Sequence, residues 1–378
     1  MYVKGDNTNV SSTSSTTTVG ENAVGVYLDG RSTLGTNAEN YVGSYNLSSA
    51  NNKLGVGAYL KGGAQAQSGT ITIKSTISQG TGTAGVIRPI GLLYAKNLDP
   101  AGLVNGLNIT IDTGSQEIIG LYAEEVAKLK NTGNLILNST GIGGYFKDTQ
   151  LENRGNVSVN ANLGYGLYVA SDGTTVISSS NYGQLDANSS NSVGLVVTNK
   201  AEVSNMIDGS GTGTINSNSA NGSIGVYVTN EGKFINDVGA IVNSTQVKAG
   251  ANPGSIGIVA KDGVVENKGI INSENIGVYG STGVGTTEIK HTGTLNIKSG
   301  TGVYLKDTGA SNTVSASLNG GTILAASGLS NISAVVAEER SKVILNGTNI
   351  TVNDNSNAIA LIGNSGKKAE LEIKSGNL

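Results

Sequence analysis

The chain has none or few of several residues on which many binding and catalytic proteins depend. Its 378 residues include no cysteine, no tryptophan, one histidine, four arginines and three prolines. The absence of cysteine excludes disulfides and thiolate metal sites, and a single histidine excludes the usual zinc ligand sets. Scarce proline leaves nearly every backbone N–H free for sheet hydrogen bonds. A net charge of −3 with four arginines argues against nucleic acid as a partner.

What the chain does contain is one short phrase, repeated from end to end. Successive copies lie about 20 to 34 residues apart, the spacing of solenoids and other repeat arrays. A chain built from one reused unit is typical of a scaffold or a binding surface. The clearest copies are Val24-Gly25-Val26-Tyr27-Leu28, Ile119-Gly120-Leu121-Tyr122-Ala123, Tyr165-Gly166-Leu167-Tyr168-Val169, Ile224-Gly225-Val226-Tyr227-Val228, Ile276-Gly277-Val278-Tyr279 and Thr301-Gly302-Val303-Tyr304-Leu305.

A second phrase, such as Asn131-Thr132-Gly133-Asn134-Leu135-Ile136-Leu137, travels with the first, and a third short apolar run lies between copies. Strands of three to five residues cannot bury their apolar faces alone, so each unit must stack on copies of itself. We therefore predict an all-β fold, a right-handed parallel β-helix (solenoid) of about 14 three-strand rungs. Leucine-rich repeats and propellers need other frames and are not favoured.

Alternation along the strands predicts which side chains are buried. We expect Ile224, Val226 and Val228 to face the core, and Gly225 and Tyr227 to face outwards. Stacking also predicts two columns of identical side chains, spaced like neighbouring strands. One is a column of amides, from Asn131, Asn153, Asn181, Asn267 and Asn319, in which His291 takes the place of an asparagine. The other is an outer column of rings, from Tyr27, Tyr59, Tyr122, Tyr145, Tyr168, Tyr227, Tyr279 and Tyr304.

Enzymatic interpretations find little support in the residues. Asp112-Thr113-Gly114 and Asp307-Thr308-Gly309 resemble the paired loops of aspartic proteases, but they follow different strands of the repeat and would not meet as a dyad. Carboxylates are scattered through the turns, which disfavours the polysaccharide lyases and hydrolases found among β-helices. We expect no catalytic residue, no cofactor and no metal site.

The whole chain resembles the passenger of a type V autotransporter. The resemblance is carried by the alternation of Asn-x-Gly-x-Ile-x-Ile with Ile-Gly-Val-Tyr-Val in a chain without cysteine. Within that class it is similar to the large outer-membrane adhesins of fusobacteria. The resemblance implies display at the bacterial cell surface, a parent anchored in the outer membrane by a β-barrel absent from this fragment, and partners among host-cell receptors, glycans or surface proteins of other bacteria. Both ends fall inside a repeat, so we expect a single monomeric β-helix segment, residues 1–378, from a longer passenger.

Two functions remain open, namely an adhesin segment that binds a ligand and a structural stalk that displays a distal tip. An adhesin is expected to carry loops inserted between its strands, whereas a stalk needs only regular turns. Residues 29–53 and 75–100 are the least periodic and are predicted to be loop insertions. Tyrosine and arginine dominate binding hot spots. The candidate ligand-binding residues there are therefore Arg31, Tyr41, Tyr45 and Arg88.

Overall fold

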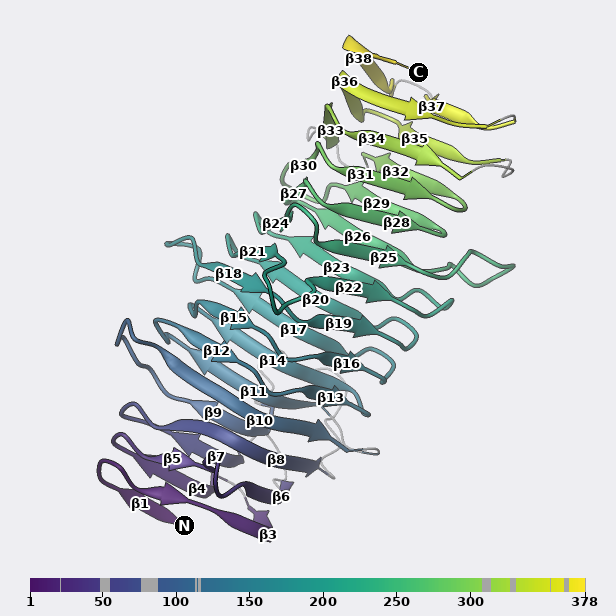
Figure 1. Ribbon diagram of the computed structural model, residues 1–378. Coiled ribbons are helices and arrows are strands. Elements are labelled where there is room, and N and C mark those ends of the chain that lie inside the picture. Colours follow the sequence, from purple (N-terminus) through teal and green to yellow (C-terminus); the bar gives the residue numbers. More distant parts are fainter. Residues whose placement is uncertain are drawn as a thin grey trace. The chain divides into compact units, whose positions relative to one another are not determined.

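The computed structural model describes residues 1–20, 22–47, 55–75, 88–112, 114, 117–307, 314–326, 331–353, 355–363 and 367–377. These residues form strands and turns, and no helix occurs among them. In particular, this part of the chain has no helix long and apolar enough to span a membrane. The strands pair in parallel with the equivalent strands of neighbouring turns, as Figure 1 shows within each unit. The predicted β-solenoid is confirmed, while its hand and the number of turns remain predictions.

The chain divides into two compact units, Met1–Val169 and Ala170–Leu378. In the first unit, one sheet collects the strands that carry the glycine–tyrosine phrase. They are β1 (Tyr2–Lys4), β4 (Val24–Asp29), β7 (Val56–Leu60), β9 (Ile90–Tyr94), β11 (Ile118–Glu124), β14 (Gly141–Lys147) and β17 (Tyr165–Ala170). The other walls are built from β2 (Asn9–Val10), β3 (Ser12–Val19), β5 (Thr33–Leu34), β6 (Tyr41–Leu47), β8 (Gln65–Ser75), β10 (Leu103–Ile111), β12 (Leu129–Asn131), β13 (Leu135–Leu137), β15 (Leu151–Asn153) and β16 (Val157–Val159).

The second unit repeats this arrangement. The phrase-bearing sheet holds β20 (Val193–Thr198), β23 (Ile224–Thr229), β26 (Ile256–Lys261), β29 (Ile276–Ser281), β32 (Thr301–Lys306), β35 (Ser333–Glu338) and β37 (Asn357–Ile362). The other walls hold β18 (Ser178–Asn181), β19 (Gln184–Ala187), β21 (Glu202–Asn205), β22 (Thr214–Ser217), β24 (Lys233–Asn236), β25 (Ile241–Ser244), β27 (Val264–Asn267), β28 (Ile270–Ser273), β30 (Thr287–His291), β31 (Thr294–Ile297), β33 (Val314–Asn319), β34 (Thr322–Ala325), β36 (Lys342–Thr351) and β38 (Glu370–Asn377).

The glycine of the repeated phrase interrupts the simple alternation of the strand. Val226 and Val228 are fully buried, as predicted, but Ile224 is partly exposed, so its predicted core position is wrong. The backbone carbonyl of Gly257 in the next turn lies where a side chain on Gly225 would begin, 2.6 Å from an ideal Cβ. That approach admits only glycine, and Gly225 is buried, so its predicted outward position is also wrong. The alternation is thus interrupted at Gly225, and the residue before it is partly exposed. Glycine thus separates an outward isoleucine from two inward valines.

The residue before the glycine of the phrase packs against the tyrosine column. In the first unit Val56, Ile90, Ile119 and Ile142 form a buried hydrophobic cluster, and the column residues from Tyr59 to Tyr168 pack against it. The ring centroids of Tyr122 and Tyr145 lie 5.3 Å apart and nearly parallel. Further stacked pairs occur in both units, so the predicted column of rings is confirmed in segments: Tyr2–Tyr27, Tyr145–Tyr168 and Tyr279–Tyr304.

The asparagine column is confirmed with changes in membership. In the first unit Asn105 Nδ2 donates to Asn131 Oδ1 (2.6 Å), and Asn131 Nδ2 donates to Asn153 Oδ1 (2.8 Å). In the second unit the amides run from Asn181 through Asn205, Asn236 and Asn267, with spacings of 2.8–3.0 Å. The predicted place of Asn319 in the column is wrong, because the register places Leu318 opposite His291 and leaves Asn319 exposed.

His291 continues the second column, as predicted. Asn267 Nδ2 lies 3.1 Å from its Nδ1, and its Nε2 lies 3.4 Å from the carbonyl oxygen of Thr322. The imidazole is 1% exposed. Burial therefore lowers the pKa of His291 to about 4.

This burial makes folding sensitive to mild acid. The unfolded chain binds a proton at His291 below its ordinary pKa of about 6.5, whereas the native chain does so only near 4. Stability should therefore fall as pH falls from 7 towards 4, with a loss of about 2 kcal/mol at pH 5 from this residue. Urea unfolding of the wild type and of His291→Asn between pH 5 and 8 measures it. A pH dependence equal in the two proteins would contradict the assignment.

The outer walls pair their own charges between turns. Lys233 Nζ lies 3.2 Å from Glu202 Oε2 and 3.3 Å from Glu266 Oε1, on the strands before and after it. Glu152 sits between Lys128 and Arg154 (3.0 and 2.7 Å). Partial burial acts to raise the pKa of Glu152, but hydrogen bonds from Arg154 and Lys128 outweigh it and lower the pKa to about 2. Charged side chains on neighbouring strands of these walls are therefore paired with one another.

Candidate functional site

Tyr41 and Tyr45 are not exposed loop residues, so the prediction that they offer contact area is wrong. Both lie in β6, 3% and 0% exposed, and their hydroxyl oxygens are 2.8 Å apart. The ring of Tyr45 fills the space that a side chain at Gly57 would need, 2.6 Å from its ideal Cβ. Burial raises the pKa of the Tyr45 hydroxyl. Large rings enter the core here because the facing glycines leave room for them.

The predicted loop insertions are wrong where the structure has strands, which is about half of their described residues. Within 29–53, Thr33–Leu34 and Tyr41–Leu47 are strands paired with β8, and residues 48–53 lie outside the described part. Within 75–100, Ile90–Tyr94 is a regular strand of the phrase-bearing sheet, and residues 76–87 lie outside the described part.

The two candidate arginines line separate concavities of the first unit. Arg31 is exposed in the turn after β4, beside Gln65 and Asp99. Arg88, two residues before β9, lines a groove of about 610 Å³ on the outer face of β7, β9 and β11. The structure therefore does not gather the four predicted residues into one site. Of the four, Arg88 alone lines this groove.

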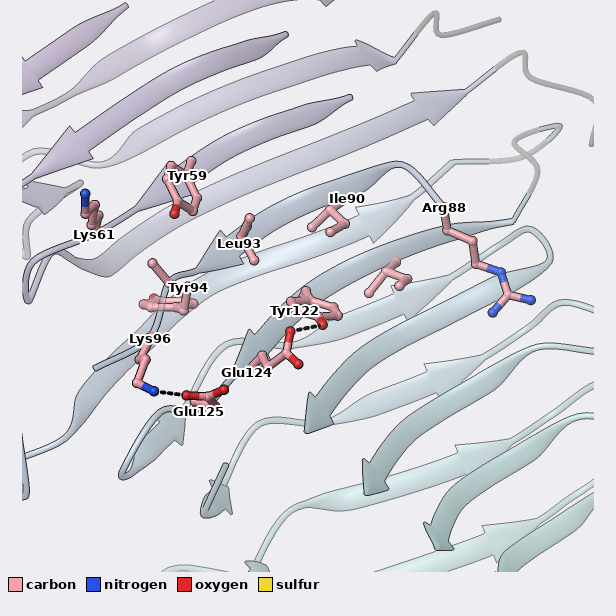
Figure 2. A pocket seen from close by; sticks show the side chains of 12 residues that line it. Tyr59, Lys61, Arg88, Ile90, Leu93, Tyr94, Lys96, Tyr122, Glu124 and Glu125 are labelled. Atoms are coloured by element: carbon pink, nitrogen blue, oxygen red, sulfur yellow. Dashed lines mark hydrogen bonds and ion pairs between the residues drawn. The ribbon is translucent and has the colours of Figure 1, made fainter. Parts of the chain in front are cut away.

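The floor and sides of this groove are apolar. Leu93 lies at its centre, Tyr59 and Tyr122 stand on either side, and Ile90 continues the surface towards Arg88 (Figure 2). Ile119 also lines the groove. Strand pairing explains this order, because Leu93 is the register partner of Tyr59 in β7 and of Tyr122 in β11. The groove is thus one position in the tyrosine column at which leucine replaces the ring. We name it the Leu93 groove.

The charged rim of the Leu93 groove is only partly self-neutralised. Glu124 accepts hydrogen bonds from Lys147 Nζ and from the Tyr122 hydroxyl, both at 2.6 Å. Those two bonds, led by the one from Lys147, lower the pKa of Glu124. Burial of its ring and the bond to Glu124 raise the pKa of Tyr122. Glu124 is therefore a charged acceptor already engaged by its neighbours.

The remaining charges differ in their partners. Lys96 forms an ion pair with Glu125 (Figure 2). Arg88 Nε lies 3.9 Å from Glu117 Oε2, at the outer limit of an ion pair. Lys61 is exposed and has no acidic partner among the described residues. The rim thus presents cationic groups at both ends.

The central residues of this groove were missed by sequence reasoning, although a signal was present. Gly91-Leu92-Leu93 aligns with Gly57-Ala58-Tyr59 and Gly120-Leu121-Tyr122, so the missing ring is visible in the sequence. Only the fold shows that the missing ring leaves an open groove. Within the described residues, no group of three or more histidine, aspartate or glutamate side chains is arranged to hold a metal ion.

No protein-family model matches the chain, and a search of curated proteins finds no significant match.

Proposed function

We propose that this chain is a segment of a bacterial cell-surface adhesin that attaches to host cells or to other bacteria through protein or glycan receptors. The Leu93 groove carries the proposal, because it combines two half-buried tyrosines, an apolar floor and a cationic rim. Aromatic and arginine side chains of this kind dominate binding hot spots. The surrounding strands are hydrogen-bonded on both sides, so a ligand meets a preorganised surface.

A structural stalk is the second candidate, and the internal columns favour it. Amides, rings and ion pairs repeat from turn to turn, which stiffens a solenoid without requiring any ligand. In that case the chain would hold a distal binding tip away from an outer membrane. A polysaccharide-degrading β-helical enzyme is the least supported candidate. A stalk does not account for an open aromatic groove.

Attachment of the purified chain to cells tests the proposal. Beads coated with the 378-residue chain should adhere to epithelial cells or to partner bacteria in excess of albumin-coated beads. Protease treatment of the cells should remove adhesion to a protein receptor, and periodate should remove adhesion to a glycan. Saturable adhesion sensitive to one treatment supports the adhesin. Absence of adhesion across a panel of cells favours the stalk.

A further inference from the structure

The tyrosine column of the first unit lacks one ring in its middle. Tyr2, Tyr27 and Tyr59 follow each other with centroid distances of 5.2 and 5.1 Å. Beyond the gap, Tyr122, Tyr145 and Tyr168 continue at 5.3 and 5.0 Å. Leu93 occupies the register position between the two series.

The gap has the dimension of one aromatic ring. Tyr59 and Tyr122 belong to strands two positions apart, so their rings are separated by roughly 10 Å at the usual strand spacing. One inserted ring would lie at about 5 Å from each, the offset spacing that aromatic pairs prefer. Leucine is shorter than tyrosine, so Leu93 forms the floor of this slot and leaves its outer part open (Figure 2).

We propose that this slot binds an aromatic side chain of a partner protein, flanked in that partner by acidic residues. The proposal rests on the adhesin function above and specifies the chemical class of ligand that binds in the Leu93 groove. The inserted ring would complete the column between Tyr59 and Tyr122. The flanking carboxylates would meet Lys61 and Arg88, whereas Glu124 and Glu125 are already engaged by lysines.

The backbone around the slot explains why side chains must carry the recognition. β9 pairs in parallel with β7 on one side and with β11 on the other. No sheet edge is therefore open here, and an extended peptide cannot add itself as a further strand. A ligand gains its contacts from ring stacking, apolar cover and charge.

The absence of tryptophan from the chain provides a direct assay. The probe is the peptide acetyl-Asp-Trp-Asp-amide, whose indole is the only tryptophan fluorophore in the mixture. Titration with the full chain should shift its emission to shorter wavelength in a saturable way. Acetyl-Asp-Ala-Asp-amide should not compete with it. Acetyl-Gly-Trp-Gly-amide should bind several-fold more weakly, because it lacks the carboxylates.

Filling the slot is the decisive variant. Leu93→Tyr completes the column and should weaken binding of the tryptophan peptide by about tenfold or more. Val238→Tyr is the control, because it adds the same ring at a valine that lies in a turn of the second unit, outside the ring column, and is 71% exposed. It should leave affinity unchanged. Arg88→Gln should weaken the acidic peptide several-fold while leaving acetyl-Gly-Trp-Gly-amide unaffected. Circular dichroism confirms that each variant retains its β spectrum.

Two results would overturn the slot. One is tryptophan-peptide binding that Leu93→Tyr leaves intact. The other is a glucuronic-acid oligosaccharide that binds in a Leu93-dependent way while the tryptophan peptide does not, which would make the groove a glycan site and keep the adhesin function. Peptide binding lost in Leu93→Tyr supports the slot even where the chain adheres to no cell tested, so the two proposals fail separately.

Discussion

Replacing Val226 by aspartate is expected to lower the free energy of unfolding by at least about 4 kcal/mol, the largest effect of any change considered for this protein. Val226 is 0% exposed and faces the core of the second unit between Leu195 and Ile258 of the neighbouring strands. A carboxylate there has no cationic partner and no access to water. It must be buried as a charge, take up a proton, or force the local turns apart.

Urea or thermal unfolding followed by circular dichroism measures this loss. Val238→Asp is the matched control, because the same change is made in the same unit at a valine that is 71% exposed. The control should change stability by less than about 0.5 kcal/mol. Equal stability of the two variants would contradict the assignment of Val226 to the core.

Breaking the asparagine column in its middle is expected to give the second-largest loss, about 4 kcal/mol or slightly less for Asn236→Leu. The Nδ2 group of Asn236 donates to Asn267 Oδ1 at 2.8 Å and to the carbonyl oxygen of Ile270 at 3.1 Å. Its Oδ1 accepts from Asn205 Nδ2 at 3.0 Å. Leucine has a similar size but leaves these buried groups without their partner, which costs more than the bonds themselves contribute.

The same unfolding measurement tests this expectation. Asn221→Leu, at an exposed position in a turn of the same unit, is the control and should have little effect. Because each amide binds both neighbours, a double variant that also carries Asn267→Leu should lose less than the sum of the two single variants. Strict additivity would indicate that the amides act independently and would contradict a connected column.

The adhesin and the stalk need not differ in fold, since both require stiff and regular turns. They differ in whether a position of the repeat carries a different side chain and so creates a surface to which a ligand can bind. The Leu93 groove is such a position, because the ring that supports its neighbours elsewhere is replaced there by a shorter side chain. The column that stabilises the wall thus also defines the shape of the slot.

The sequence by itself determined the class of fold. A phrase repeated about every 28 residues, with strands too short to bury their own apolar faces, admits only stacking. The same periodicity placed Asn131, Asn153 and His291 in columns, because residues at one position of the repeat must lie above one another. These inferences depend on repeat spacing alone, so they hold without knowing any contact between turns.

Only the tertiary structure decided which side each residue faces and where the surface opens. Alternation placed Ile224 inside, but the close approach of Gly225 to the next turn reverses it, and no single strand reveals that contact. Tyr41 and Tyr45 have the composition of a binding loop, yet both are buried. Gly43 in the same strand leaves room for the ring of Tyr41, and Gly25 and Gly57 leave room for the ring of Tyr45. A leucine at position 93 is compatible both with a filled surface and with a groove, so the sequence does not decide between them. The rings on the strands before and after it make the groove.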